Sequence, residues 1–416
     1  MGEAETSRRA RERLLRGLAW DDFCDTLKQA GRLVEAFDDG QGGGPSDLER
    51  AEWYRFLSRM VRNGFERMIE NCEPERPRLR DAPWRQSINV QNPDQDHLMC
   101  EFEDGRHAYR ITGDRGTLPY FVMATWTAPQ PADLAARDWA ASGVAGLAEF
   151  DPTNLETRSF LTSRDIDFDA EGRFSVLLSA DEPTAGPRNW LRLDPDATGV
   201  LIRLVYDDRR RVVPPHFEIE RVDHPRPRPI EPEEVAAGLA KSGQIVLGYA
   251  ELVRRWWQEN LDQRPNTIVF SESTYLSNGG VLDRLHGFGS WRKGRDEALV
   301  IRFRPPECEH WILQLCNRWQ ENLDVYEDGQ GYLTKFTAKP EPDGSILAIV
   351  ADRDPGIGGS WIDSFSHETG VFSLRLIQTE GGPAVTIHRL PLARLEREGL
   401  AALDTVTPIL SGQVTD

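Results

Sequence analysis

The sequence predicts a mainly β protein with two copies of an antiparallel β domain, preceded by a helical segment and interrupted by one central helix. Two observations support this prediction. A pattern of Asp, Trp and Gly-Val occurs twice, and consecutive members are nine positions apart in each copy. The tryptophans of the two copies, Trp190 and Trp361, are 171 residues apart (361 − 190), a domain-sized offset rather than a solenoid period. Short β-rich runs bounded by Gly, Pro and Asp also occur in two groups.

Helical spacing is confined to two parts of the chain. Apolar residues recur every three or four positions from Leu14 to Met68, and Ser46 with Glu49 is a capping-box signature inside that stretch. The second helical part, Glu233 to Asn260, follows a proline-rich connector at His224–Pro232 that cannot continue a strand or a helix. Its apolar content supports docking within the chain and docking across a dimer equally well.

The β-rich runs define the predicted domains. The longest runs are Leu98–Phe102, His107–Ile111, Tyr120–Trp126, Phe174–Leu178, Val200–Tyr206, Ala298–Phe303, Trp311–Cys316, Ile346–Ala351, Phe372–Ile377 and Ala384–Leu390. The predicted division is a helical segment at 1–80, a first β domain at 81–225, a linker and helix at 226–265, a second β domain at 266–400 and a tail at 401–416. The first domain is the longer one, and we expect Pro129–Phe150 to be its insertion.

Composition excludes several classes of function. The chain has 68 acidic and 50 basic residues, a formal charge of −18, which would repel phosphate backbones and anionic membrane surfaces. No apolar run approaches the roughly 20 residues that span a bilayer. Five scattered cysteines without a CxxC pair fit a reducing compartment, so we expect a cytoplasmic protein that binds neither nucleic acid nor membrane. Nucleotide-binding and metal-binding spacings are both missing, which predicts no cofactor and no metal.

Several motifs resemble one known family. They are Asn92-Pro93-Asp94, His107 to Gly113, Asn189-Trp190-Leu191, and Asp352 to Gly356 followed by Trp361-Ile362-Asp363 and His367. Together they resemble the domain-of-unknown-function 1214 family over nearly the whole chain. The resemblance implies a jelly-roll-like β-sandwich for each domain, with helical elements in front. It implies no settled activity.

The duplication separates structural residues from candidate functional residues. Residues found in both copies, such as Trp190 with Trp361 and Arg203 with Arg375, are best explained as requirements of the fold. Polar residues found only in the second copy are better functional candidates, and these are Asp354, Asp363 and His367. One imidazole and two carboxylates could supply a general acid and base. A structural turn at Asp354-Pro355-Gly356 is the competing interpretation.

Two functions of different class remain open. The first is a cofactor-independent hydrolase or lyase for a small, largely apolar metabolite, with His367 as acid or base, Asp363 and Asp354 assisting it, and Arg375 stabilising negative charge. The second is a noncatalytic protein that binds a small molecule or carbohydrate, with ligand-facing tryptophans near strand ends. Exposed faces at Trp126 and Trp319 would favour the second. The predicted substrate-binding residues are Trp361, Trp319, Gln314, His310, Trp190 and Asp181. The sequence leaves a homo-oligomer open.

Overall fold

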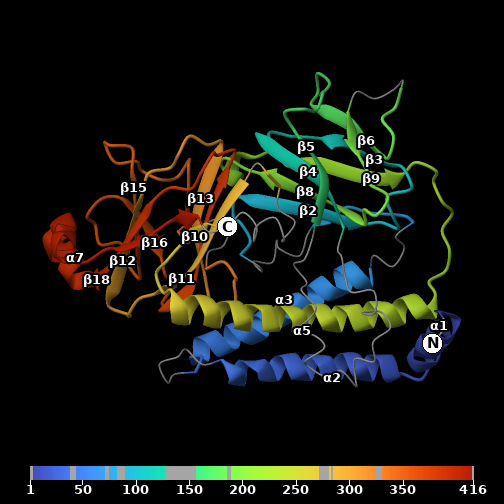
Figure 1. Cartoon of the computed structure of the whole chain (residues 1–416), viewed down its shortest axis with the longest axis horizontal. Coiled ribbons are helices and arrows are strands. Elements are labelled where there is room, and N and C mark those ends of the chain that lie inside the picture. The colour runs from blue at the N-terminus through green and yellow to red at the C-terminus, as the bar shows by residue number, and fades with distance from the viewer. Residues whose placement is uncertain are drawn as a thin grey trace.

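The computed structural model describes residues 3–37, 44–70, 75–81, 90–127, 156–184, 189–270, 281–282, 284–323 and 330–414. Two β-sandwiches lie side by side above a layer of long helices (Figure 1). Pro129–Phe150, the predicted insertion, lies outside the described residues. Among the described residues, no helix is long and apolar enough to span a bilayer.

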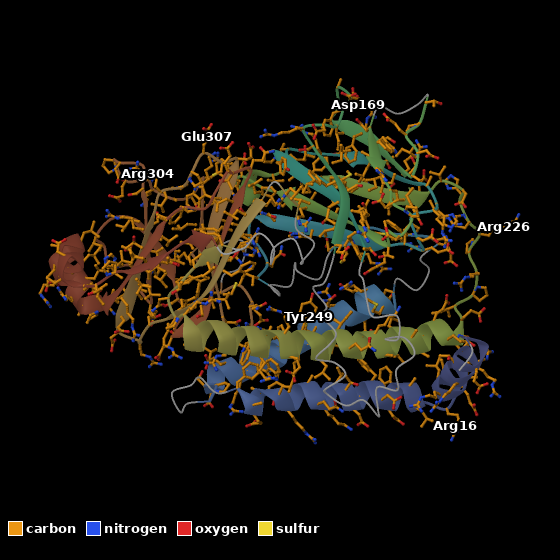
Figure 2. All side chains as sticks on the ribbon, in the orientation of Figure 1. Arg16, Asp169, Arg226, Tyr249, Arg304 and Glu307 are labelled. Carbon is orange, nitrogen blue, oxygen red and sulfur yellow. The ribbon has the colours of Figure 1, made fainter. Side chains whose placement is uncertain are left out.

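Among the described residues, the helical layer contains four helices of 13 residues or more. They are α1 (Glu3–Leu15), α2 (Leu18–Arg32, continued by the short η1, Leu33–Ala36), α3 (Asp47–Met68) and α5 (Pro232–Gln263). The predicted capping box starts α3, because Ser46 Oγ accepts from the Glu49 amide (3.3 Å) and the Glu49 carboxylate accepts from the Ser46 amide (2.8 Å). The apolar faces of α2, α3 and α5 form one core around Trp53, and Tyr249, labelled near the middle of α5 in Figure 2, belongs to it.

The first sandwich contains two sheets. One has the order β1-β2-β8-β4-β5 and the other the order β7-β6-β3-β9. The strands are β1 (Arg80–Asp81), β2 (Gln95–Glu101), β3 (Tyr109–Asp114), β4 (Tyr120–Thr127), β5 (Glu156–Thr162), β6 (Arg173–Ser179), β7 (Trp190–Arg192), β8 (Gly199–Val205) and β9 (His216–Arg221), with the turn η3 (Arg209–Arg211) before β9. Every second residue of β4 and β8 enters the core between the sheets.

The second sandwich repeats this arrangement. Its sheets have the orders β14-β13-β17-β11-β10-β20 and β16-β15-β12-β18-β19. The strands are β10 (Val269–Phe270), β11 (Arg284–Arg292), β12 (Glu297–Phe303), β13 (His310–Cys316), β14 (Tyr332–Thr334), β15 (Ile346–Ala351), β16 (Ser360–Asp363), β17 (Thr369–Ile377), β18 (Val385–Pro391), β19 (Ile409–Ser411) and β20 (Gln413–Val414). A short helix, α7 (Leu392–Glu398), and η4 (Gly399–Thr405) pack on the outer side of the smaller sheet.

The strand orders show that the two sandwiches are copies of one unit. Taken in chain order, β2 to β9 correspond to β11 to β18, and each strand has the same neighbours in both copies, such as β2-β8-β4 and β11-β17-β13. Trp190 and Trp361 occupy matching places, since each indole donates to a carbonyl at the end of the neighbouring strand, Ser179 or Ala351. The predicted fold class, two antiparallel β-sandwiches with a helical segment and a central helix, is confirmed.

The larger sheets of the two sandwiches face each other. Phe372, Leu374 and Leu376 of β17 point into their own sandwich core, so the intervening residues point outward. Ile377, one of these, packs against Tyr120, Val122 and Val205 on the outer face of the first sandwich. At the other end of the same face, Val371 and Cys316 pack on the helical core. The outer face of the β13-β17-β11 sheet is therefore buried along its length.

Candidate functional site

The buried outer face of the second sandwich carries polar side chains. Its outward positions include His286 on β11, Ser373 and Arg375 on β17, and His310 and Gln314 on β13. His286, Ser373, His310 and Gln314 are each at most 4% exposed. A buried polar surface needs an explanation, because apolar residues would pack there without the cost of desolvating polar groups. We call these five residues, with the facing residues described next, the interdomain cluster.

The first sandwich contributes the matching pair of side chains. His97 on β2 lies opposite Arg203 on β8, and His286 on β11 lies opposite Arg375 on β17. Between the two arginines the offset is 172 residues (375 − 203), one more than between the tryptophans. A shift of one residue along a strand moves a side chain to the other face of the sheet. At the tryptophan offset of 171, Arg203 would match Leu374, which points inward, whereas at 172 it matches Arg375, which points outward. Each copy therefore presents one His–Arg pair toward the other.

A buried polar segment that leads into the start of β2 crosses between the sandwiches. Residues 91–96 are all buried, and the side chains of Asn92 and Asp94 bond residues of the second sandwich. Asn92 accepts from Arg375, and Asp94 contacts the Nε2 atom of His310. Asp96 accepts from Tyr206 (2.9 Å) and from Arg209 (2.9 Å) within the first sandwich. The segment thus joins both sheets of the interdomain cluster.

Gln314 fixes the start of that segment. Its Nε2 atom donates to the carbonyls of Val90 (3.1 Å) and Gln91 (3.0 Å). Val90 has a φ of 55°, a left-handed conformation that is unfavourable for a β-branched residue. Such conformations persist only where surrounding contacts hold them, and they occur often at functional sites. Here the contacts are the bonds from Gln314 and from the Val90 amide to the Gln320 carbonyl (2.8 Å).

Three buried atoms of the cluster have no hydrogen-bond partner among the described residues. They are Nδ1 of His310, Oδ1 of Asp94 and Oε1 of Gln314. The residues that carry them are 2%, 3% and 0% exposed, respectively. Leaving a buried polar atom unsatisfied costs roughly 1–3 kcal/mol, so a water molecule or a ligand group that bonded any of these atoms would stabilise the structure. His310 is held by Asp94 through one ring nitrogen, and its other nitrogen is available for chemistry.

The cluster has a positive electrostatic field. Burial lowers the pKa of His97 well below its ordinary value, and the charges of Arg203, Arg284, Arg375 and Arg209 lower it further. Burial and Arg375 have the same effect on the pKa of His286. Both imidazoles are therefore neutral at pH 7. The Arg375 Nε atom donates to the His286 ring (3.0 Å to Nε2), which orients the guanidinium.

The structure places His367 and Asp363 in a different location. His367 Nε2 bonds the Glu52 carboxylate of α3 (3.0 Å), and both side chains are buried. Asp363 accepts from the Phe365 amide (2.7 Å), and burial raises its pKa. Asp354 is exposed and accepts from the Gly356 amide (2.9 Å), which is the structural turn. His367 thus attaches a helix to the second sandwich, and Asp354 does not assist it.

The remaining predicted residues divide into two groups. Arg375, His310 and Gln314 all belong to the interdomain cluster. The tryptophans fill structural positions: the Trp319 indole donates to the Glu49 carbonyl (2.7 Å) in the helical core, and Trp361 bonds Ala351. Asp181 is exposed. Trp126 and Trp319 are 3% and 0% exposed, which removes the ligand-facing tryptophans that favoured carbohydrate binding.

The sequence does not predict the partners of His310 and Arg375 in the interdomain cluster. In the sequence, Asn92 and Asp94 belong to a motif that carries no predicted site residue, and no local pattern marks His97 or His286. Their signal is a His placed opposite the Arg of each copy, which is visible only when the strand pairing is known. Within the described part of the chain, no group of three or more His, Cys, Asp or Glu side chains is arranged to hold a metal ion.

Comparisons with known proteins identify a fold and no activity. No family model and no curated protein matches the chain. An uncharacterized protein from Burkholderia cenocepacia has a similar structure, with a TM-score of 0.80 and 29% identity, covering 92% of this chain and 99% of that one. The VPA0106 protein from Vibrio parahaemolyticus aligns with a TM-score of 0.42 and 12% identity over 79% of this chain and 94% of that one. The Burkholderia similarity indicates that the arrangement of both sandwiches and the helices occurs in another protein.

Proposed function

We propose that the interdomain cluster binds a small molecule and that the protein is a cofactor-independent hydrolase or lyase acting on it. The observation that carries the proposal is the buried His310–Asp94 pair, in which Nδ1 of His310 and Oδ1 of Asp94 have no hydrogen-bond partner among the described residues. An imidazole held by a carboxylate through one nitrogen, with the other nitrogen directed at a substrate, is a common arrangement for general acid–base catalysis. The sequence predicts this role for His367, and the geometry favours His310 instead.

The proposed chemistry needs only residues of the cluster and water. In a hydrolase, His310 Nδ1 would take a proton from a water molecule as it attacks the substrate, and would return the proton to the leaving group. In a lyase, the same atom would remove a proton from carbon while the leaving group departs. In both reactions Asp94 would hold the ring and stabilise its protonated form. Arg375 keeps the role expected from the sequence, stabilisation of developing negative charge.

The duplication supports a specialised role for the second sandwich. The position of His310, opposite Ile377, corresponds to Tyr120, opposite Val205, in the first copy. Gln314 corresponds in the same way to Ala124. The fold therefore does not require His310 or Gln314 at these positions, because the other copy has the same strand without them.

The noncatalytic alternative is a protein that binds a small molecule at the same place and leaves it unchanged. Membership of the domain-of-unknown-function 1214 family, a cytoplasmic location and a homo-oligomer also remain proposals. The cytoplasmic location is supported by the four described cysteines, Cys24, Cys100, Cys308 and Cys316, which are all free.

The test compares three proteins on one defined mixture of small esters, amides, hydroxy acids and carboxylic acids. The wild type, His310→Asn and the control His388→Asn are incubated with the mixture, and mass spectrometry follows each compound. We expect the wild type and the control to consume one class of compound, with His310→Asn slower by about a hundredfold or more. Equal consumption by His310→Asn would contradict the proposal. Binding without consumption by any of the three would favour the noncatalytic alternative.

A further inference from the structure

Phe336 covers one face of the buried His310 ring. The two rings are stacked, with their centroids 5.5 Å apart and their planes inclined by 19°. The two side chains differ in exposure, because His310 is 2% exposed and Phe336 is 52% exposed. The phenyl ring therefore lies between the proposed acid–base residue and solvent.

His310 begins its strand close to the molecular surface. Glu307, three residues earlier, is exposed and is labelled at the upper edge of the molecule in Figure 2. The neighbouring strand β14 lies at the edge of the sheet and pairs Thr334 with Ile312. Continued by two residues, this antiparallel register brings Phe336 level with His310. The contact between the two rings thus follows from strand pairing.

The backbone that carries Phe336 is fixed by hydrogen bonds. Its amide and the amide of the next residue both donate to Thr334 Oγ1 (3.2 Å each). Lys335 Nζ donates to the carbonyls of Cys308 (2.8 Å) and Glu309 (3.1 Å), which ties the turn to the start of β13. The turn can therefore stay in place while the phenyl ring rotates about its own side-chain bonds, a motion of picoseconds to nanoseconds for an exposed side chain.

The first sandwich has a different side chain at the matching place. Thr162 ends the edge strand β5 as Thr334 ends the edge strand β14. Two residues further on, the first copy has Arg164 and the second has Phe336. The fold therefore does not require an aromatic ring at this position.

Arg164 itself reaches the start of β13 from the first sandwich. It pairs with Glu309, which directly precedes His310. The two side chains of the pair are 53% and 35% exposed, and ion pairs with such exposure contribute little to stability. The surface next to His310 therefore includes two side chains that can move at low cost, Phe336 and Arg164.

We propose that Phe336 is the gate of His310: the stacked ring shields the imidazole from water, and a ligand reaches the imidazole when the ring turns outward. This inference rests on the proposed function only in taking His310 as the residue that a ligand must reach. An apolar ring at the entrance agrees with the largely apolar metabolite expected from the sequence. Phe336 acts on the reaction through His310 and is therefore a positioning residue.

The experiment measures how fast diethyl pyrocarbonate, which acylates neutral imidazole, labels each histidine of the full chain. Mass spectrometry of the labelled peptides gives the rates. We expect His310 to be labelled about tenfold faster or more in Phe336→Ala than in the wild type, because alanine leaves one face of the imidazole open to solvent. In Phe336→Tyr, which keeps the ring, His310 should be labelled as slowly as in the wild type.

Other residues of the chain serve as controls. Phe160→Ala removes a phenyl ring that is 39% exposed on β5 of the first sandwich, and it should leave the labelling of His310 unchanged. His216, exposed on β9, reports the reagent concentration, and the buried His286 reports any general opening of the interdomain cluster. If Phe336→Ala does not fold, Phe336→Leu, which lacks the flat ring, replaces it with an expected acceleration of about threefold or more.

Two results would overturn the inference. One is equal labelling of His310 in the wild type and in Phe336→Ala, and the other is acceleration of His286 by the same factor, which would indicate a general opening. The proposed function fails separately: faster labelling of His310 in Phe336→Ala, with turnover unaffected by His310→Asn, would keep the gate and reject the catalytic role. Turnover that depends on His310, with labelling unchanged by Phe336→Ala, would do the reverse.

Discussion

Replacing His367 with Asn should loosen the attachment of α3 to the second sandwich. The His367–Glu52 bond of 3.0 Å joins two side chains that are 6% and 7% exposed. Removing one member of a buried ion pair typically costs 3–5 kcal/mol, because the other charge is left buried. We take about 3 kcal/mol, the lower end of that range, because Arg55 still contacts Glu52 at 3.2 Å in the variant. This corresponds to about a hundredfold change in a local opening equilibrium.

The pH dependence of that loss has a defined sign. Burial alone would lower the pKa of His367, but the hydrogen bond and the charge of Glu52 outweigh burial and raise it. A raised histidine pKa stabilises the fold fully below the unfolded value of about 6.5 and loses that effect as pH rises through the folded value. Other charged groups near the His367–Glu52 pair include Arg55, which contacts Glu52, and Asp363, whose pKa His367 affects. The wild type should therefore hold α3 more tightly at pH 6 than at pH 8.5, and the variant should show little of that difference.

Hydrogen exchange followed by mass spectrometry measures this opening peptide by peptide. We expect residues 47–68 to exchange about a hundredfold faster in the variant at pH 6, after correction for intrinsic rates, with the strands of the first sandwich unchanged. The control is His388→Asn, on β18 of the same sandwich. Unchanged exchange of α3 in His367→Asn would refute the assignment of His367 to helix attachment.

Three further predictions concern other parts of the fold. Burial and Arg375 lower the pKa of His286, so the unfolded state binds more protons than the folded state below pH 6.5. The free energy of unfolding, measured by urea titration, should therefore fall as the pH drops from 6.5, and His286→Asn should reduce that fall. The same pH dependence in the wild type and the variant would contradict a neutral His286. Gly370→Ala should lower the free energy of unfolding by about 3 kcal/mol or more, because the added Cβ would lie 2.0 Å from the Cys316 carbonyl oxygen and 2.6 Å from the Trp291 indole nitrogen. The control Gly381→Ala, which has open space around it, should be nearly neutral. Equal thermal shifts for the two variants would count against the packing of β17. Iodoacetamide should label Cys24 and Cys308 before Cys316, whose pKa burial raises to about 12, and mass spectrometry of the labelled peptides would reveal the opposite order if that burial is incorrect.

Local patterns were sufficient to predict the helices and most long strands. The capping box at Ser46 and the apolar run Tyr120–Trp126 gave elements close to those observed, because their side chains follow the period of the structure they form. Arg284–Arg292 was missed. Its polar residues and glycines interrupt the apolar pattern. The glycines are needed for packing, because a side chain at Gly287 would collide with Ile268 and Phe270, and one at Gly289 would collide with the Thr267 carbonyl.

The candidate site was only partly predictable, because its residues come from pairings that are distant in sequence. Arg375 was found through the duplication, and His310 and Gln314 as polar positions on a strand next to it. The partner of His310 is Asp94, 216 residues away, and the partner of His367 is Glu52, 315 residues away. Closeness in sequence grouped His367 with Asp363 and Asp354, although strand register and helix docking decide which of these side chains have a shared environment.

A crystal structure of the protein soaked with the class of compound that it consumes tests the central claim most directly, that the interdomain cluster is a ligand site built around His310 and Asp94. We predict density from a non-protein molecule within hydrogen-bond distance of His310 Nδ1 and Asp94 Oδ1. Protein side chains that satisfy both atoms, with no other density beside them, would contradict the account.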